Sequence, residues 1–457
     1  MKKFLAVIAS VALAAMLLLS GCFLKGEQGE TGAAGRDGIN GQDVSIMEIY
    51  EEAKKIEGNE NLTFDEFLKK YLNYTDTQLD EKASLQARMN YSLMSGVSII
   101  SRFSYGSGYY NTSYQAFTGS GVIIDLDKES GDAYVVTNCH VVYDDTSRYT
   151  FADEVYLFLY GQDIKDINYQ VNSDYSIKEL GGNYKITAQI IGASVSYDIA
   201  LLKVTNSDVL KSSDAVAADF ADDEHVYVGE TVYTVGNAAS EGLSVSDGII
   251  SKDSEYINVG MSDLYPNDVT TFRVMRTSAA VNHGNSGGGL FNKDGKIIGI
   301  VNAKDDEADT DNLGYALPAS NVKRLVKLMR DAYANGDGTF TSGITKAYLN
   351  VTLETVNSTA IYNDGRAEIT ESVMVGYGSG QPALSHLQYG DLITNIKVVD
   401  SANTEKENVA VTRRYTVGDV MLSVRLNDSV ILTVKRGQSE TEVKIDFTNS
   451  SYFRTFN

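Results

Sequence analysis

The chain has 457 residues, which is enough for two or three domains, and 43% of them are hydrophobic. Acidic side chains outnumber basic ones by 61 to 39, and the resulting formal net charge of −22 repels nucleic acid and anionic lipid headgroups. Nucleic acid is therefore excluded as a substrate. Only Cys22 and Cys139 are present, so we expect a fold stabilised by its hydrophobic cores and not by disulfides.

Residues 1–21 have the pattern of an export signal. Lys2 and Lys3 precede an apolar run that ends at Leu19, and Ser20-Gly21-Cys22 follows directly. This arrangement resembles a bacterial lipoprotein signal, which implies a lipidated Cys22 and a location on the extracytoplasmic face of the cell membrane. An ordinary secretory signal cleaved near Gly21 is the alternative.

Residues 22–43 form the expected lipid anchor and a collagen-like spacer. Six Gly-x-y triplets run from Gly26 to Asp43 without a proline. We interpret them as a hydrophilic spacer, with a triple-helical trimeric stalk as the alternative. Residues 44–92 are predicted to be a small helical module that serves as a spacer or an oligomerisation element, because apolar side chains recur at helical spacing: Ile46, Ile49, Tyr50 and Ala53, then Phe64, Phe67, Leu68 and Tyr71.

Residues 93–333 are rich in short β-branched and aromatic runs, which predict strands. The clearest runs are 121–124, 133–137, 155–159, 186–191, 201–204, 226–228, 232–236, 248–251 and 297–301. Short strands in close succession are typical of β-barrels. A helix is expected to begin at Pro318 and to present Val322, Leu325, Val326 and Met329 on one face. It should end near Gly336, inside a linker placed at residues 334–345.

Three motifs in this region contain chemically reactive residue types in a fixed order. They are Thr137-Asn138-Cys139-His140-Val141-Val142, Asp198-Ile199-Ala200-Leu201-Leu202 and Gly284-Asn285-Ser286-Gly287-Gly288. A serine hydroxyl becomes nucleophilic when a neutral imidazole accepts its proton and a buried carboxylate orients that imidazole. The nucleophile elbow of α/β-hydrolases is rejected, because a strand, an Asp-Gly turn and a second strand follow Ser286 where an elbow requires a helix.

The order histidine, aspartate, serine and the residues around each of them resemble the HtrA (DegP-like) family of trypsin-like serine proteases, which have a C-terminal PDZ domain. The resemblance implies a mostly β fold with a chymotrypsin-like double β-barrel and the catalytic residues His140, Asp198 and Ser286. It also implies an oxyanion hole formed by the backbone N–H groups of Gly284 and Ser286, a homotrimer, and cleavage of unfolded or exposed polypeptides in protein quality control. The alternative is a catalytically silent, surface-tethered peptide-binding scaffold or chaperone, because His283 and Gly289 stand where the family typically has prolines.

We expect a substrate pocket formed by Ala279, Ala280 and Val281, which is uncharged and should accept small or medium aliphatic side chains. No cofactor and no metal are expected. The acidic run at residues 305–311 lacks the spaced ligands and the glycine of an EF-hand loop.

Residues 346–450 resemble an α+β PDZ domain. Tyr348-Leu349-Asn350-Val351 corresponds to the peptide-binding entry strand, a helix is expected near residues 417–426, and a late strand at 430–436. The resemblance implies binding of peptide C-termini by β-augmentation. Asn350 stands where the family usually has glycine.

Overall fold

The structure is a computed structural model. It describes residues 53–56, 59, 66–67, 70–71, 84–106, 112–162, 168–171, 177–181, 184–221, 225–259, 270–304, 313–336, 338, 340–378 and 386–456. The predicted signal peptide, Cys22, the collagen-like triplets and the acidic run at residues 305–311 lie outside this range.

The chain divides into two units, residues 1–87 and residues 88–457. In the first unit the side chains of Ala53 and Phe67 are buried, and the rings of Phe67 and Tyr71 lie 5.6 Å apart. The rest of both predicted apolar stripes lies outside the described residues. Helix α5 (Ser84–Leu93) spans the boundary between the two units.

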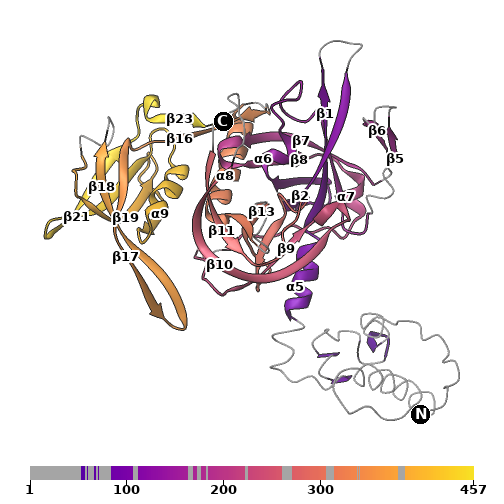
Figure 1. The fold of residues 1–457 in the computed structure, drawn as a ribbon, viewed down its shortest axis with the longest axis horizontal. Coiled ribbons are helices and arrows are strands. Elements are labelled where there is room, and N and C mark those ends of the chain that lie inside the picture. Colours follow the sequence, from indigo (N-terminus) through magenta and orange to yellow (C-terminus); the bar gives the residue numbers. More distant parts are fainter. Residues whose placement is uncertain are drawn as a thin grey trace. The chain divides into compact units, whose positions relative to one another are not determined.

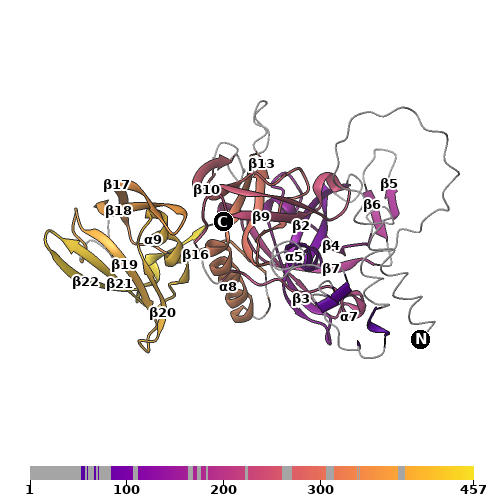
Figure 2. The same cartoon turned by 90° about the horizontal axis from the view of Figure 1, so that it is seen from below.

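The second unit begins with a six-stranded barrel (Figures 1 and 2). Its strands are hydrogen-bonded in the order β7-β4-β1-β2-β3-β8, and pairing of β7 with β8 closes the ring. The bounds are β1 Gly96–Tyr105, β2 Ser113–Asp127, β3 Asp132–Thr137, β4 Glu154–Leu159, β7 Ile186–Ser194 and β8 Ile199–Val204. Helices α6 (Cys139–Val142) and α7 (Asp208–Ser212), the 3-10 turn η3 (Val195–Tyr197) and the hairpin β5 (Asn168–Val171) and β6 (Ile177–Gly181) accompany them.

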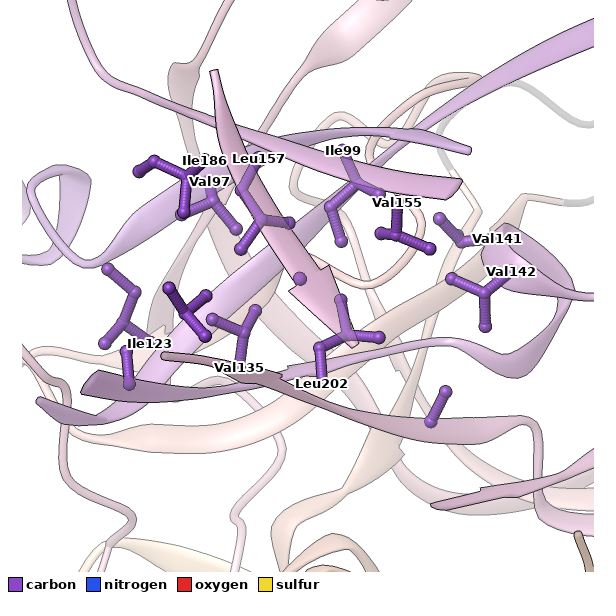
Figure 3. Packing of buried hydrophobic residues seen from close by; sticks show 14 of the residues in the cluster. Val97, Ile99, Ile123, Val135, Val141, Val142, Val155, Leu157, Ile186 and Leu202 are labelled. Atoms are coloured by element: carbon purple, nitrogen blue, oxygen red, sulfur yellow. The ribbon is translucent and has the colours of Figure 1, made fainter. Parts of the chain in front are cut away.

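The interior of this barrel is filled by branched aliphatic side chains (Figure 3). Ile99, Ile123, Val135, Leu157 and Leu202 are at most 1% exposed. They come from strands that are distant in sequence, and each fully buried side chain of this kind contributes roughly 1.5–3 kcal/mol. The barrel is therefore a packed core that fixes the ends of its strands.

A second closed barrel follows, with strand order β10-β11-β14-β13-β12-β9. Its bounds are β9 Thr231–Gly236, β10 Ser244–Val259, β11 Thr270–Thr277, β12 Gly289–Asn292, β13 Ile297–Lys304 and β14 Gly314–Pro318, and the 3-10 turn η4 (Ala238–Ser240) lies between β9 and β10. These two barrels confirm the predicted chymotrypsin-like double β-barrel. The prediction of a strand at 226–228 is wrong, because Gly229 has φ +86° and the N–H of Glu230 donates to the carbonyl of Tyr227, which makes a turn.

Helix α8 (Ala319–Asn335) forms as the sequence predicts. Val322, Leu325, Val326 and Met329 are all buried, and the helix packs on β7, β8 and β13, and so against both barrels. Gly192 permits this approach, because a Cβ atom there would lie 2.7 Å from Met329.

The C-terminal domain is an α+β structure with a sheet in the order β17-β18-β19-β21-β22, and β20 pairs with β19. Strand β15 (Thr341–Ser342) joins β7 of the first barrel, and β16 pairs with the last strand, β23. The remaining bounds are β16 Ile344–Ala347, β17 Val351–Asn363, β18 Arg366–Gly378, β19 Leu392–Val399, β20 Glu405–Ala410, α9 Arg414–Val420, η6 Met421–Ser423, β21 Ser429–Arg436, β22 Ser439–Asp446, η7 Ser450–Tyr452 and β23 Phe453–Phe456. The predicted late strand is confirmed as β21, and the predicted helix begins three residues earlier than expected.

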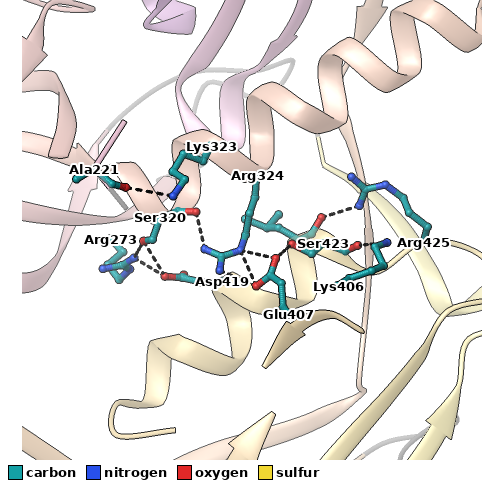
Figure 4. Close-up of polar contacts among 11 residues, drawn as sticks. Ala221, Arg273, Ser320, Lys323, Arg324, Lys406, Glu407, Asp419, Ser423 and Arg425 are labelled. Carbon is teal, nitrogen blue, oxygen red and sulfur yellow. Dashed lines mark hydrogen bonds and ion pairs between the residues drawn. The ribbon is translucent and has the colours of Figure 1, made fainter. Parts of the chain in front are cut away.

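Charged side chains join this domain to the second barrel and to α8 (Figure 4). Arg273 of β11 pairs with Asp419 of α9 and also donates to the Ser320 hydroxyl at 2.8 Å. Arg324 of α8 pairs with Glu407 of β20 at 2.7 Å. Burial raises the pKa of Asp419, and the positive charges of Arg273 and Arg324 do not fully reverse that shift.

Candidate functional site

His140 lies on the short helix α6, directly after β3. Its neighbours Cys139, Val141 and Val142 are buried in the core of the first barrel and anchor this turn. The imidazole remains 37% exposed. The local sequence therefore fixes the backbone of the helix and leaves one ring edge accessible.

Asp198 is fully buried directly before β8 and orients His140 through two contacts. Its Oδ1 accepts from the backbone N–H of His140 at 2.9 Å, and its Oδ2 lies 2.8 Å from Nδ1 of the ring. Asp198 itself has φ 47° and ψ 45°, a left-handed conformation that is uncommon outside glycine. A buried carboxylate is tolerated when hydrogen bonds replace its hydration, as they do here.

Asn302 of β13 provides the third contact to this carboxylate. It is 3% exposed, and its Nδ2 donates to Oδ2 of Asp198 across the boundary between the barrels. Asn302 was not among the residues predicted from the sequence. The signal that was available is a single amide residue at the end of the apolar run 297–301.

Burial and the charge of Asp198 change the acidity of the His140 ring and of the neighbouring Cys139 thiol. Partial burial lowers the pKa of His140, but the charge of Asp198 and its hydrogen bond raise it by more, so the net pKa lies above 6.5. Burial, followed by the charge of Asp198, raises the pKa of the Cys139 thiol well above its usual range. Cys139 is free and buried, and it packs as a small residue in the core of the first barrel.

Ser286 lies in the loop between β11 and β12 and approaches the other two residues from the second barrel. Its Oγ donates to the carbonyl of Asn302 at 3.0 Å. In the described part of the chain no hydrogen bond joins this Oγ to His140. The structure thus brings together the three predicted residues, with the hydroxyl turned toward Asn302.

Glycines shape the backbone around Ser286. Gly284 and Gly287 have φ of +94° and +86°, and a Cβ atom at Gly287 would lie 2.1 Å from the carbonyl oxygen of Ser120. The N–H groups of Gly284 and Ser286 have no hydrogen-bond acceptor among the described residues. Both donors of the predicted pair are therefore available to a ligand.

The predicted substrate-pocket residues differ in accessibility. Ala279 is fully buried, and its backbone packs against Gly248. Ala280 is exposed and Val281 is half-buried. Of the three, only Ala280 and Val281 are accessible to a substrate side chain, and both are uncharged.

The predicted peptide-binding segment leads into β17, the first strand of the C-terminal sheet. Leu349 is buried, and Asn350 has φ +59°, a backbone conformation that glycine adopts more easily. The guanidinium of Arg454 lies 4.1 Å from the ring of Tyr348 and donates to Oδ1 of Asn350 at 3.0 Å. A positive charge therefore lies beside this loop.

Within the described residues, no group of three or more metal-binding side chains occurs. Over the same residues, no helix is long and apolar enough to cross a membrane.

The two barrels, with a histidine, a buried aspartate and a serine where they meet, define the class of trypsin-like serine peptidases. Residues 119–300 match the trypsin-like peptidase domain family. This match covers the segments that contain His140, Asp198 and Ser286.

Several HtrA serine proteases are similar to this chain. The serine protease Do-like HtrA of Bacillus subtilis is 30% identical over 246 residues, which are 53% of this chain and 44% of that protein. The serine protease Do-like HtrA of Lactococcus lactis subsp. lactis is 28% identical over 347 residues, which are 73% and 71% of the two chains. A solved structure, the HtrA-type protease AlgW with decapeptide, covers 82% of this chain and 99% of that chain at 19% identity, with a TM-score of 0.44. These similarities, together with the peptidase domain match, support an HtrA-family serine protease.

Proposed function

We propose that the protein is a serine endopeptidase that cleaves unfolded or exposed polypeptides in protein quality control. The observation that carries the proposal is the His140–Asp198 pair, which is joined by two hydrogen bonds, in a trypsin-like fold in which Asn302 links Asp198 to Ser286. A silent scaffold has no need of a buried carboxylate at this position, so this geometry favours the enzyme over the scaffold.

The reaction assigns a role to each residue. Asp198 keeps the proton of His140 on Nδ1, which leaves Nε2 free to accept the proton of the Ser286 hydroxyl. Oγ then attacks the peptide carbonyl, and the N–H groups of Gly284 and Ser286 stabilise the oxyanion. His140 returns its proton to the departing amine, and water hydrolyses the acyl-enzyme by the same route.

The orientation of Ser286 supports a resting state of the enzyme. Its Oγ must leave the carbonyl of Asn302 before it can donate to His140. Hydrogen bonds at such sites often tighten only when substrate binds. We propose that a bound polypeptide shifts the population toward the productive rotamer.

Digestion of an unfolded protein tests the endopeptidase proposal. We expect reduced, unfolded β-casein to be cut by the full-length chain and left intact by Ser286→Ala. Mass spectrometry of the fragments should place small or medium aliphatic residues at P1, because Ala280 and Val281 are uncharged. A folded wild-type protein that leaves casein intact, with and without added peptide, would contradict the proposal.

We further propose that the C-terminal domain is a PDZ domain that binds peptide C-termini. β17 is an edge strand, which suits β-augmentation, and Arg454 places a positive charge beside the loop at Asn350. A fluorescent decapeptide with a free carboxylate should bind more tightly than its C-terminal amide. Equal binding of the two peptides would argue against this assignment.

The anchoring proposal rests on sequence alone. We propose that Cys22 is lipidated, that the protein acts at the extracytoplasmic face of the cell membrane, and that it forms a homotrimer. Metabolic labelling with an alkyne fatty acid should mark the wild-type chain and not Cys22→Ala. The mass of the detergent-solubilised chain tests the trimer, and a purely monomeric species would contradict it.

A further inference from the structure

A short segment has an unusual backbone. It lies beside the loop between β11 and β12 that contains Ser286, which we call the nucleophile loop. Ala239 has φ 54° and ψ 18°, and Ser240 has φ 60°, so two successive non-glycine residues of η4 are left-handed. Such conformations are unfavourable for L-residues and persist when surrounding contacts over-determine them. We call η4 and the preceding Asn237 the strained turn. Its contacts indicate which part of the nucleophile loop it holds in place.

The first contact fixes the peptide bond before Gly284. The backbone N–H of Ala239 donates to the carbonyl of His283 at 2.7 Å. Because a trans peptide directs its C=O and N–H to opposite sides, this bond turns the N–H of Gly284 away from the strained turn. The two loops touch at backbone level, since a Cβ atom at Gly284 would lie 2.2 Å from the carbonyl oxygen of Asn237.

The second contact fixes the next peptide bond through the hydroxyl of Ser120. This fully buried hydroxyl of β2 donates to the carbonyl of Gly284 at 2.6 Å and accepts from the N–H of Asn237 at 2.7 Å. The backbone N–H of Ser120 donates to the carbonyl of Ser286 at 2.8 Å. One residue of the first barrel thus connects the strained turn to the nucleophile loop.

We propose that Ser120 and Ala239 are positioning residues of the oxyanion hole, an inference that rests on the proposed function. Together they hold the carbonyls of His283 and Gly284 away from the reacting carbonyl, so that N–H donors remain where negative charge develops. Rotation of the His283–Gly284 peptide would replace the Gly284 donor by an acceptor and repel the oxyanion. Donors that are oriented before the reaction stabilise charge without reorganisation during it.

Ser120→Ala compared with Ser95→Ala tests the assignment. Both hydroxyls are buried, and that of Ser95 donates to the carbonyl of Ser92 at 2.7 Å, away from the nucleophile loop. We expect Ser120→Ala to lower kcat by roughly 10- to 100-fold with KM changed by less than about threefold, since a whole oxyanion donor is worth about 10²–10³. Ser95→Ala should retain wild-type kcat, because loss of the Ser95 hydroxyl should lower only the stability of the fold.

A second pair of substitutions tests the donor at residue 239. Ala239→Gly keeps the N–H and adopts positive φ easily, so it should retain kcat. Ala239→Pro removes the N–H and cannot reach φ 54°, so it should lose kcat at least as strongly as Ser120→Ala. Retention of kcat by both Ser120→Ala and Ala239→Pro would overturn the inference.

Failure of this inference is distinguishable from failure of the proposed function. An inactive wild-type protein would contradict the proposed function. The proposed orientation of the His283–Gly284 peptide would then be tested by crystallography. A crystal structure of Ala239→Pro, which lacks the N–H that holds the His283 carbonyl, should then show that carbonyl rotated away from residue 239. An unchanged His283–Gly284 peptide would overturn the inference.

Discussion

The nucleophile loop and the contact between the second barrel and the C-terminal domain are held by different kinds of interaction. Around Gly284 and Ser286 the contacts come from neutral hydroxyls and backbone groups, such as those of Ser120 and Ala239. At the domain contact they are mostly ion pairs, including Arg273–Asp419 and Arg324–Glu407. Neutral, buried contacts fix a geometry with little dependence on salt, whereas charged groups that have lost their hydration hold a contact that is easier to open.

This difference assigns distinct roles to the two regions. The site must keep its donors within tenths of an ångström, because orientation determines the stabilisation of the transition state. The domain contact needs only to favour one arrangement of the C-terminal domain on the second barrel. Substitutions in the two regions should therefore change different quantities, kcat in one and the stability of docking in the other.

The largest effect is expected at Asp198. Asp198→Asn keeps the size of the side chain and removes the charge that fixes the tautomer of His140, so kcat should fall by about 10⁴-fold. Steady-state hydrolysis of a peptide substrate measures this change. A loss below tenfold would mean that Asp198 only supports the fold.

Arg273→Met should have the next largest effect, on the docking of the C-terminal domain. It leaves the carboxylate of Asp419 buried without its main partner, and such changes destabilise by about 3–5 kcal/mol. Thermal unfolding should show a lowered midpoint, and small-angle X-ray scattering should show a larger radius of gyration.

The matched control is Arg330→Met. Arg330 pairs with Asp125 at 2.8 Å, but these side chains are 39% and 49% exposed, so the pair is worth about 0–1 kcal/mol. Equal effects of the two substitutions would contradict the description of a desolvated domain contact.

Asn302→Leu should affect the catalytic site and leave the domain contact unchanged. It preserves approximate volume and removes the Nδ2 donor to Asp198, so kcat should fall by roughly 10- to 100-fold. The radius of gyration should stay at the wild-type value, because Asn302 lies outside the domain contact. Expansion of the molecule without a change in kcat would be the opposite of this expectation.

The pH dependence of activity should follow His140. Its pKa lies above 6.5, so kcat/KM should rise with pH, reach half its maximum above pH 6.5 and then level off. The contribution of the raised pKa to folding stability has the opposite pH dependence. It is fully present below pH 6.5 and is lost as the pH rises through the folded-state value. Asp198→Asn should move the midpoint of the residual activity downward, and an unmoved midpoint would assign the titration to another group.

The sequence predicts the parts of the molecule that follow local patterns. Helix α8 forms with its predicted apolar face because the 3.6-residue period depends on nearby residues. His140, Asp198 and Ser286 were identifiable because reactive residue types stand in three recognisable motifs. Residues 226–228 look like a strand in composition, but the positive φ of Gly229 makes them enter a turn.

Other features depend on contacts between distant segments and leave no local pattern. Asn302 meets Asp198 across 104 residues, and Arg273 meets Asp419 across 146 residues. Each of these side chains reads as an ordinary polar residue in its own strand or helix. Ser120 likewise gains its role only when the folded first barrel places β2 beside Gly284.

The central claim is that His140, Asp198 and Ser286 form a working catalytic triad, and covalent labelling tests it most directly. The detergent-solubilised full-length protein would be treated with a fluorophosphonate probe, with and without a C-terminal peptide, alongside Ser286→Ala. We expect one probe molecule to attach to Ser286 of the wild-type chain and Ser286→Ala to remain unlabelled. A folded wild-type protein that stays unlabelled under both conditions would contradict this claim and identify a silent scaffold.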